Sequence, residues 1–506
     1  MTQTLIMVTI VLYLCLVLVI GFLYSKKNKN TDDFYLGGRK LGPIVTAMSA
    51  EASDMSSWLL MGLPGVAYLT GVADAAWTAI GLAIGTYVNW LIVARKIRTY
   101  TKGYDSVTLP EFFSKRFGGS KVLTFIAALM IVVFFIPYTA SGFAACGKLF
   151  ASLFGVDYIV AMVISAAVIV LYCTLGGFLA ASTTDLIQSI VMTIALVVVV
   201  VFGINVAGGF DAVMNNAKSL PGYLDFFNTY VPETGASKEY GILSICSMLA
   251  WGLGYFGMPH VLLRFMAIED ENKLKISRRV ATVWVVISLA VAVFIGIVGL
   301  AMTKAGALEI LTGSNSETII IKIADVLSKN GVLATIVAGV ILAGILAATM
   351  STADSQLLAA ASGVSQNMID ECFGIKLTQK KSLLIARVTV VVISIIAVIL
   401  AYDPNSSVFE IVSFAWAGFG ATFGPVVLLA LFWKRANKQG AIAGMVACGV
   451  MIFAWKYGIA QLGGAFAIYE LLPSFIVAIV VNVIVSLLTK APEQSVLDKF
   501  EEVKKM

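Results

Sequence analysis

The stretch SAEASDMSSWLLMGLPG, Ser49 to Gly65, places polar and helix-breaking residues inside an apolar segment of transmembrane length. It contains Glu51, Asp54, four serines, two glycines and a proline. Ionisable groups at membrane depth are costly, and irregular backbone is tolerated there only inside protein or beside a cavity. The stretch therefore predicts a broken membrane helix that exposes carbonyls and hydroxyls to an ion.

The rest of the chain has the composition of an integral membrane protein. Of its 506 residues, 59% are hydrophobic and 13% are charged, and the mean hydropathy is +0.93. A soluble domain averages about 25% charged residues. The net charge of +6 does not indicate nucleic acid as a partner, because the basic residues cluster in short loops between apolar spans. The six cysteines are scattered and fit neither a zinc site nor a disulfide framework.

Thirteen stretches approach the ~20 apolar residues that a membrane helix needs. They lie near 5–24, 41–66, 74–94, 122–150, 157–177, 186–206, 241–262, 280–303, 332–360, 382–401, 407–433, 439–460 and 467–489. The first lacks a basic start and a cleavage site, so we expect a retained helix rather than a signal peptide.

Lysine and arginine concentrate in alternate loops, which predicts the orientation of the chain. One of these loops holds Lys26, Lys27, Lys29, Arg39 and Lys40, and another is expected from Arg264 to Arg279. The bias places the amino terminus outside and the carboxyl terminus in the cytoplasm, with the protein in the plasma (inner) membrane.

Two longer connections are expected on the external side. The first, near 208–240, shows turn residues and aromatics without a strong period. The second, near 304–331, holds the runs ALEILTG and TIIIKIADVL, which could form short helices. The carboxyl end, SVLDKFEEVKK, is expected to be a short charged tail.

A second irregular span suggests internal repetition. AWGLGYFGMPH, Ala250 to His260, sets three glycines and a proline among aromatics in span seven. The two irregular spans are five helices apart, and a repeat with an odd number of spans must be inverted in the membrane. Spacing alone therefore predicts a five-plus-five inverted repeat. The expected division is 1–40, a first repeat at 41–206, an external loop at 207–240, a second repeat at 241–433, and two helices with a tail at 434–506.

A third polar stretch, AATMSTADSQ, runs from Ala347 to Gln356. Ser351 and Thr352 follow Ala348 by three and four residues, so a helix would bring both hydroxyls near its carbonyl. Such an oxygen-only site with little charge suits a monovalent cation, whereas Ca²⁺ or Mg²⁺ would be expected to gather more carboxylates. The alternative is that both hydroxyls simply bond to carbonyls within their own helix.

Six motifs together resemble the sodium/solute symporters, and most closely the sodium/proline symporter branch. They are LGGRKLGP, SAEASDMSSWLLMGLPG, LPEFFSKRF, GGFLAASTTD, AWGLGYFGMPHVLLRFMA and MSTADSQLLAAAS, and the resemblance runs from about Thr31 to Trp433. It implies an all-α membrane protein of thirteen helices with a LeuT-type core. It also implies import of a small zwitterion, L-proline first, coupled to sodium by alternating access; another amino acid or small organic solute is the alternative.

Matched motif by motif, the resemblance implies roles for individual residues. The implied sodium site uses backbone oxygens of Ala52, Met55 and Ala348 and the hydroxyls of Ser351 and Thr352. The implied substrate pocket is lined by Ser56, Tyr138, Trp251, Tyr255 and Pro259, with Ser56 also near the ion. Coupling is implied for Arg39, Asp54 and Asp185. We expect the Asp54 carboxylate to accept bonds from nearby amides or hydroxyls, holding the unwound backbone, or to sit near a cation.

Four residues depart from the branch pattern and leave selectivity and sodium number open: Glu51, Ser57, Met258 and Asp354. Trp251 and Tyr255, spaced i and i+4, could instead be ordinary core packing. Their glycine neighbours favour the pocket, where a tryptophan face suits a secondary ammonium. His260, the only histidine, is expected to pack or to hydrogen-bond rather than relay protons.

Two other function classes fit less well. A channel or receptor would be expected to show a ring of charges, a repeated filter motif or a signalling domain. An intramembrane enzyme would need a constellation such as HExxH or a paired aspartate. The sequence shows neither set of features. It also shows no nucleotide-binding loop, so ATP is not implied.

Overall fold

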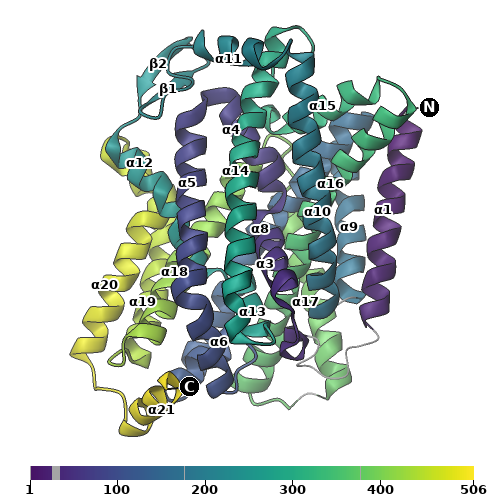
Figure 1. The fold of residues 1–506 in the computed structure, drawn as a ribbon. Helices are drawn as coiled ribbons and strands as arrows, with labels where there is room; N and C mark the ends of the chain where they lie inside the picture. The colour runs from purple at the N-terminus through teal and green to yellow at the C-terminus, as the bar shows by residue number, and fades with distance from the viewer. Residues whose placement is uncertain (1, 26–34, 176, 377, 506) are drawn as a thin grey trace.

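Long apolar helices build the molecule, as the hydropathy pattern predicts. The computed structural model describes residues 2–25, 35–175, 177–376 and 378–505. Its first half contains α1 (Thr2–Ser25), η1 (Gly37–Arg39), α3 (Pro43–Ser57), η2 (Trp58–Gly62), α4 (Leu63–Thr70), α5 (Val72–Val88), η3 (Asn89–Val93), α6 (Ala94–Gly103), α7 (Leu109–Arg116), α8 (Lys121–Phe154), α9 (Tyr158–Leu175), α10 (Phe178–Val206) and α11 (Phe210–Lys218). The amino and carboxyl ends lie at opposite ends of the helix bundle (Figure 1).

The second half continues the bundle. It contains α12 (Ile242–Leu249), η4 (Ala250–Gly257), α13 (Pro259–Ala267), η5 (Glu271–Lys273), α14 (Leu274–Lys304), η6 (Gly313–Thr318), α15 (Ile319–Ser328), α16 (Val332–Ser362), η7 (Gly363–Cys372), α17 (Gln379–Leu400), α18 (Val408–Phe432), α19 (Lys438–Tyr457), η8 (Ile459–Leu462), η9 (Gly464–Phe466), α20 (Leu471–Leu488) and α21 (Gln494–Lys504). Helices α3 and α16 contact each other, and both also contact α8, α10 and α13.

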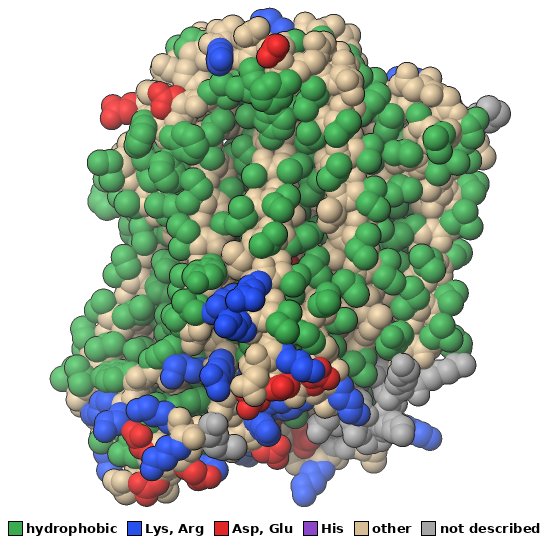
Figure 2. Space-filling model, in the orientation of Figure 1, with side chains coloured by type: hydrophobic (Ala, Val, Ile, Leu, Met, Phe, Trp, Pro, Cys, Tyr) green, Lys and Arg blue, Asp and Glu red, His purple; other side chains and the backbone are tan. Residues whose placement is uncertain are grey.

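The chain is a multi-pass integral membrane protein. Among the described residues, 10 helices are long and apolar enough to cross a membrane, or 11 if the bent pair 242–257 and 259–267 is one span. Two further predicted spans, 41–66 and 157–177, correspond to the interrupted helix α3–η2–α4 and to α9. On the face shown in Figure 2, apolar side chains form a broad band, and most charged side chains gather toward the two ends of the molecule. A band of this kind faces lipid rather than water.

The connections between spans differ from the predictions in two places. In 208–240, where no regular structure was expected, β1 (Asn228–Val231) and β2 (Ala236–Glu239) form an antiparallel hairpin. Gly235 closes its turn with φ +65°, donating its N–H to the Val231 carbonyl (2.9 Å). Strands of four residues are too short to leave a readable alternation. TIIIKIADVL lies within η6 and α15, as predicted, whereas the ALEIL part of the other run is not helical.

The carboxyl tail is an ordered helix rather than only a charged tail. Phe500 of α21 lies under the Arg116 guanidinium (4.3 Å) and against Tyr100 (5.5 Å). Two sets of sequence observations fall outside the described residues: the basic residues Lys26, Lys27 and Lys29, and Gly176 at the start of GGFLAASTTD.

Candidate functional site

The predicted break in the second span is present at Ser56. Its φ of +47° and ψ of −170° interrupt α3, and positive φ is uncommon for any residue other than glycine. The Trp58 N–H closes the break by donating to the Ser56 hydroxyl (3.1 Å) and to the Met55 carbonyl. The backbone upstream therefore loses its regular helical partners, which frees carbonyls for contacts outside α3.

The second predicted break is also present. After the 3₁₀ stretch η4, Met258 takes an extended conformation (φ −75°, ψ 107°) and Pro259 begins α13. The two pieces are bent by 47°. Glycine is required at Gly254, because an added Cβ would lie 2.0 Å from the Trp416 indole nitrogen. This close approach packs the broken helix against α18.

Four of the five predicted ion ligands come together between α3 and α16. The Ser351 hydroxyl is 2.8 Å from the Ala52 carbonyl and 3.1 Å from the Ala348 carbonyl. The Thr352 hydroxyl is also 3.1 Å from the Ala348 carbonyl. Bonding within one helix explains only part of this arrangement, because Ser351 reaches across to the broken helix. The result is a buried cluster of neutral oxygens, which suits a monovalent cation.

Met55, the fifth predicted ligand, is placed differently. Its carbonyl accepts the Trp58 N–H at the break, and no described hydrogen bond joins it to Ala52, Ala348, Ser351 or Thr352.

Aromatic side chains surround the second break. Trp251 lies against Tyr469 (ring centres 5.0 Å apart), Trp58 (5.4 Å) and Phe409 (5.5 Å). Tyr255 meets Trp416 edge-on at 5.1 Å. These contacts agree with core packing, the simpler interpretation.

Unpaired polar atoms within that aromatic cluster favour a ligand. Among the described residues, the indole N–H of Trp251, the indole N–H of Trp58 and the hydroxyl of Tyr255 are buried without a hydrogen-bond partner. A buried unpaired polar group costs about 1–3 kcal/mol. A polar solute would supply the missing partners. Tyr138 is already engaged, because its hydroxyl donates to the Asp54 carbonyl (2.8 Å).

Among the described residues, no hydrogen bond joins the Asp54 carboxylate to the unwound backbone, and the hydroxyl that interacts with it is that of Tyr255. The Asp54 side chain is buried, and Oδ1 has no hydrogen-bond partner among the described residues. The nearest basic group is His260, whose Nε2 lies 3.8 Å away. The Trp58 N–H donates instead to the Met55 carbonyl and to the Ser56 hydroxyl. A carboxylate buried in this way lacks a counter-charge, so the other half of the expectation, a nearby cation, gains weight.

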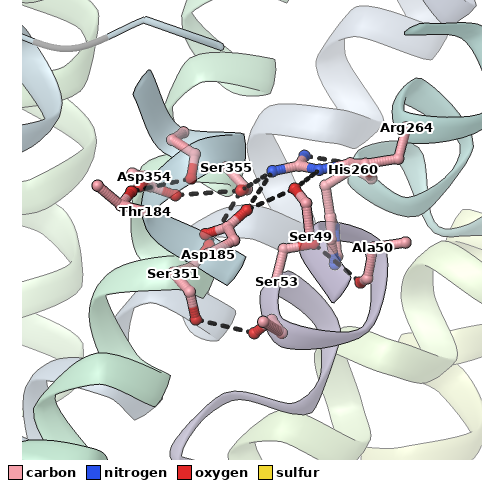
Figure 3. Close-up of polar contacts among 12 residues, drawn as sticks. Ser49, Ala50, Ser53, Thr184, Asp185, His260, Arg264, Ser351, Asp354 and Ser355 are labelled. Carbon is pink, nitrogen blue, oxygen red and sulfur yellow. Dashed lines mark hydrogen bonds and ion pairs between the residues drawn. The ribbon is translucent and has the colours of Figure 1, made fainter. Parts of the chain in front are cut away.

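Asp185 belongs to a buried network that links four helices (Figure 3). Its Oδ2 accepts from the Ser49 hydroxyl of α3 (2.6 Å) and from Arg264 Nη2 of α13 (3.1 Å). Arg264 also donates to Ser49 (3.0 Å) and to Ser355 of α16. Ser355 in turn donates to Asp354 (3.1 Å), so the added carboxylate joins the same network.

Arg264 corrects the sequence interpretation. We counted it as the first basic residue of a loop, but it lies within α13 and only 1% of its surface is exposed. The sequence did indicate a role for Arg264, since a charged residue inside the apolar run PHVLLRFMA is a functional candidate by its depth in the membrane alone. Ser49 and Ser355 carried no comparable signal.

Arg39 lies away from the oxygen cluster and fastens helix ends together. Its guanidinium donates to the carbonyls of Met266 (2.7 Å), Ser106 (2.8 Å) and Thr101 (3.3 Å). It thereby joins the segment before α3 to α6 and to the end of α13.

The remaining departures from the branch pattern are buried near the breaks. Glu51 accepts the Trp90 indole N–H (2.8 Å), and its other oxygen has no partner among the described residues. The Ser57 hydroxyl is likewise buried and unpaired. Met258 is the extended residue at the second break.

Comparisons with known proteins agree with this geometry. A family model described as "Sodium:solute symporter family" matches residues 34–448. The osmoregulated proline transporter OpuE of Bacillus subtilis is 40% identical over 99% of this chain and 98% of its own. The high-affinity proline transporter PutP of the same organism is 41% identical over 96% and 98%. A sodium/proline symporter of Haemophilus influenzae is 41% identical over 99% and 97%.

Solved structures are similar in fold. A Na⁺-coupled sialic acid symporter in a substrate-bound outward-open state has a TM-score of 0.79 at 19% identity, covering 97% of this chain and 99% of its own. The transporter MhsT in complex with L-phenylalanine has a TM-score of 0.56 at 13% identity, covering 88% and 98%. At these identities the likeness extends to the fold alone.

Proposed function

The chain belongs to the sodium:solute symporter family and is a sodium-coupled transporter rather than an enzyme; from this premise we propose that it imports L-proline. Relatives about 40% identical over nearly their whole length are named as proline transporters. The geometric observation that carries the proposal is the buried Asp54 carboxylate beside the break at Ser56, whose Oδ1 has no hydrogen-bond partner among the described residues. Another amino acid or a small organic solute is the second candidate, since Glu51, Ser57 and Met258 depart from the pattern of the sodium/proline symporter branch.

The coupling sodium binds in the oxygen cluster between α3 and α16. Its ligands are the carbonyls of Ala52, Met55 and Ala348 and the hydroxyls of Ser351 and Thr352. The short contacts among four of these residues support this assignment. The Met55 carbonyl accepts the Trp58 N–H here and keeps a second lone pair for the ion. Asp54 then supplies negative charge near the ion without being one of its five ligands.

The solute lies against the second break. Trp251 offers a π face to the secondary ammonium of proline, and Tyr255 and Trp251 carry unpaired donors for its carboxylate. The amino end of α13, at Pro259, adds the favourable end of a helix dipole for the same carboxylate. Ser56 and Tyr138 complete the pocket at the first break.

The transport cycle alternates access by moving one repeat against the other. We propose thirteen spans, in which the interrupted helix α3–α4 is the second and α12–α13 the seventh. Spans two to six and seven to eleven then form the inverted repeat, followed by α19 and α20. The amino terminus lies outside and the carboxyl terminus in the cytoplasm. The two breaks, five spans apart, support the repeat, and the basic loops support the orientation.

One sodium ion supplies enough energy for this work. Entry down ~100 mV releases ~2.3 kcal/mol, and a tenfold sodium gradient adds ~1.4 kcal/mol. Together these sustain about 500-fold accumulation of a neutral solute at one-to-one coupling.

The proposal is tested by uptake of radiolabelled L-proline into proteoliposomes that contain no ATP. Inward sodium should accelerate uptake, and unlabelled L-proline should compete better than a panel of other amino acids, betaine and pantothenate. A panel member that competes better than proline would assign the second candidate. Uptake that does not depend on sodium would contradict the proposed coupling.

The aromatic donors provide a prediction about the pocket. Tyr255→Phe keeps the ring and removes one unpaired hydroxyl, so we expect half-saturating proline to rise about fivefold to tenfold, as for one lost hydrogen bond of 1–1.5 kcal/mol. Trp251→Ala should have a larger effect. Tyr158→Phe is the matched control, since that hydroxyl donates to the Ala401 carbonyl (2.8 Å) away from the breaks. Unchanged proline affinity in both pocket variants would mean that Trp251 and Tyr255 only pack in the core and do not bind the solute.

The Asp185–Arg264 pair provides a prediction about coupling. Arg264→Gln leaves a buried carboxylate without its counter-charge, a change that typically costs 3–5 kcal/mol, so thermal stability and uptake should both fall sharply. Asp185→Asn with Arg264→Gln should recover most of the stability. If Asp185 acts in ion movement, the stable double variant should still transport poorly. Recovery of uptake along with stability would limit the pair to a structural role.

A further inference from the structure

A basic cluster lies on the membrane-facing surface between α5 and α14, apart from the transport site. Arg278, in the second turn of α14, places its guanidinium carbon 5.5 Å from the ring centre of Tyr87 on α5. Lys275 and Arg279 are exposed on α14, and Arg95 is exposed on α6, which continues from α5. Figure 2 shows Lys and Arg side chains over α5 and α14 that extend from the basic end into the apolar band.

The surface around this cluster is apolar and open. Tyr87 is 43% exposed, and Leu91 and Ile276 are exposed to a similar degree. Arg278 follows the first residue of α14 by four positions, about 6 Å along the helix axis. Its charge therefore lies at the border of the hydrophobic band, where a cation without a counter-ion is costly.

No acidic side chain in the described part of the chain provides that counter-ion. Within the described ranges, none of Arg95, Lys275, Arg278 and Arg279 forms an ion pair. The acids of the preceding turn act on other cations: Glu269 is paired with Lys273 (2.7 Å), and Asp270 and Glu271 lie near Arg98. The cluster thus presents unneutralised positive charge next to hydrocarbon-facing side chains.

We propose that this surface binds the phosphate of an anionic phospholipid. A guanidinium presents two parallel donors that match a phosphate. The ring of Tyr87 holds the Arg278 guanidinium in place. Arg95, Lys275 and Arg279 add positive charge to the same surface, which attracts anionic lipid. The acyl chains lie along exposed apolar side chains of α5 and α14, including Ile84, Val283 and Ile287. A soluble phosphate would leave this apolar surface unused, so the lipid is the better fit.

The test is lipid-dependent thermal unfolding of the full chain in detergent. Phosphatidylglycerol is titrated against phosphatidylcholine with the same acyl chains, and glycerol phosphate serves as the soluble headgroup. Phosphatidylglycerol should raise the unfolding temperature of the parent more than phosphatidylcholine does, and glycerol phosphate should have no effect. Arg278→Gln should weaken the apparent phosphatidylglycerol affinity about fivefold, the equivalent of ~1 kcal/mol, and Arg278→Lys should retain part of it.

Arg387→Gln is the matched control, because Arg387 is an exposed arginine on another membrane helix, α17. It should keep the parental preference for phosphatidylglycerol. An equal loss in both glutamine variants would mean general charge attraction and overturn the site. A parental response in Arg278→Gln, or an equal response to glycerol phosphate, would also overturn it.

Discussion

Asparagine in place of Asp54 is expected to raise the sodium concentration for half-maximal uptake by about 10- to 100-fold. The estimate corresponds to 1.5–3 kcal/mol for an interaction with a charged group. The physical reason is the position of the carboxylate, which is buried beside the break with one oxygen unpaired among the described residues and with His260 as its nearest basic group. Sodium entry would neutralise it, and asparagine removes that charge while keeping the side-chain shape.

Glutamate at the same position separates charge from geometry. Asp54→Glu keeps the carboxylate but shifts it by one methylene, so we expect partial sodium-driven uptake with a smaller loss of sodium affinity. Uptake is measured over a series of sodium concentrations at fixed proline. An asparagine variant with parental sodium affinity would defeat a coupling role for Asp54.

Removal of both hydroxyls in Ser351→Ala/Thr352→Ala is expected to raise the half-saturating sodium concentration about 100-fold or more. Each hydroxyl contributes one of five proposed oxygen ligands, and contacts with charged groups are worth roughly 1.5–3 kcal/mol each. The fold should survive, because alanine is a better helix former than serine or threonine. Sodium-induced stabilisation in the absence of proline measures the effect directly, since a ligand stabilises only the state that binds it.

The neighbouring residue Thr349 supplies the control. It is buried on the same helix, and its hydroxyl bonds the Ile345 carbonyl (2.9 Å) within α16, without a described bond to α3. Thr349→Ala therefore removes an ordinary intrahelical bond. Equal sodium dependence in Thr349→Ala and in the double variant would mean that the hydroxyls of Ser351 and Thr352 do not bind the coupling sodium.

The sequence predicted the features that depend on composition along one segment. Both helix breaks were foreseen because Ser49–Gly65 and Ala250–His260 place polar or flexible residues where apolar helix was expected. The approach of Ser351 to Ala348 followed from helical spacing. These inferences needed no knowledge of which helices touch.

The features that the sequence did not predict depend on contacts between helices. The Ser49–Asp185–Arg264–Ser355 network joins residues from four helices, and spacing along the chain carries no trace of it. The Asp54 carboxylate was expected to accept bonds from nearby amides or hydroxyls, or to sit near a cation, and the Trp58 amide donates instead to the Met55 carbonyl and the Ser56 hydroxyl. The β1–β2 hairpin was missed because its strands are only four residues long.

Proline-dependent entry of radioactive sodium into proteoliposomes tests the coupling of the two solutes most directly. With the membrane potential clamped and no ATP present, external L-proline should accelerate sodium entry through the parent protein. The same proline should have little effect on Ser351→Ala/Thr352→Ala at the parental half-saturating sodium concentration. Sodium entry that is equal with and without proline, while labelled proline still enters, would contradict sodium-coupled proline import.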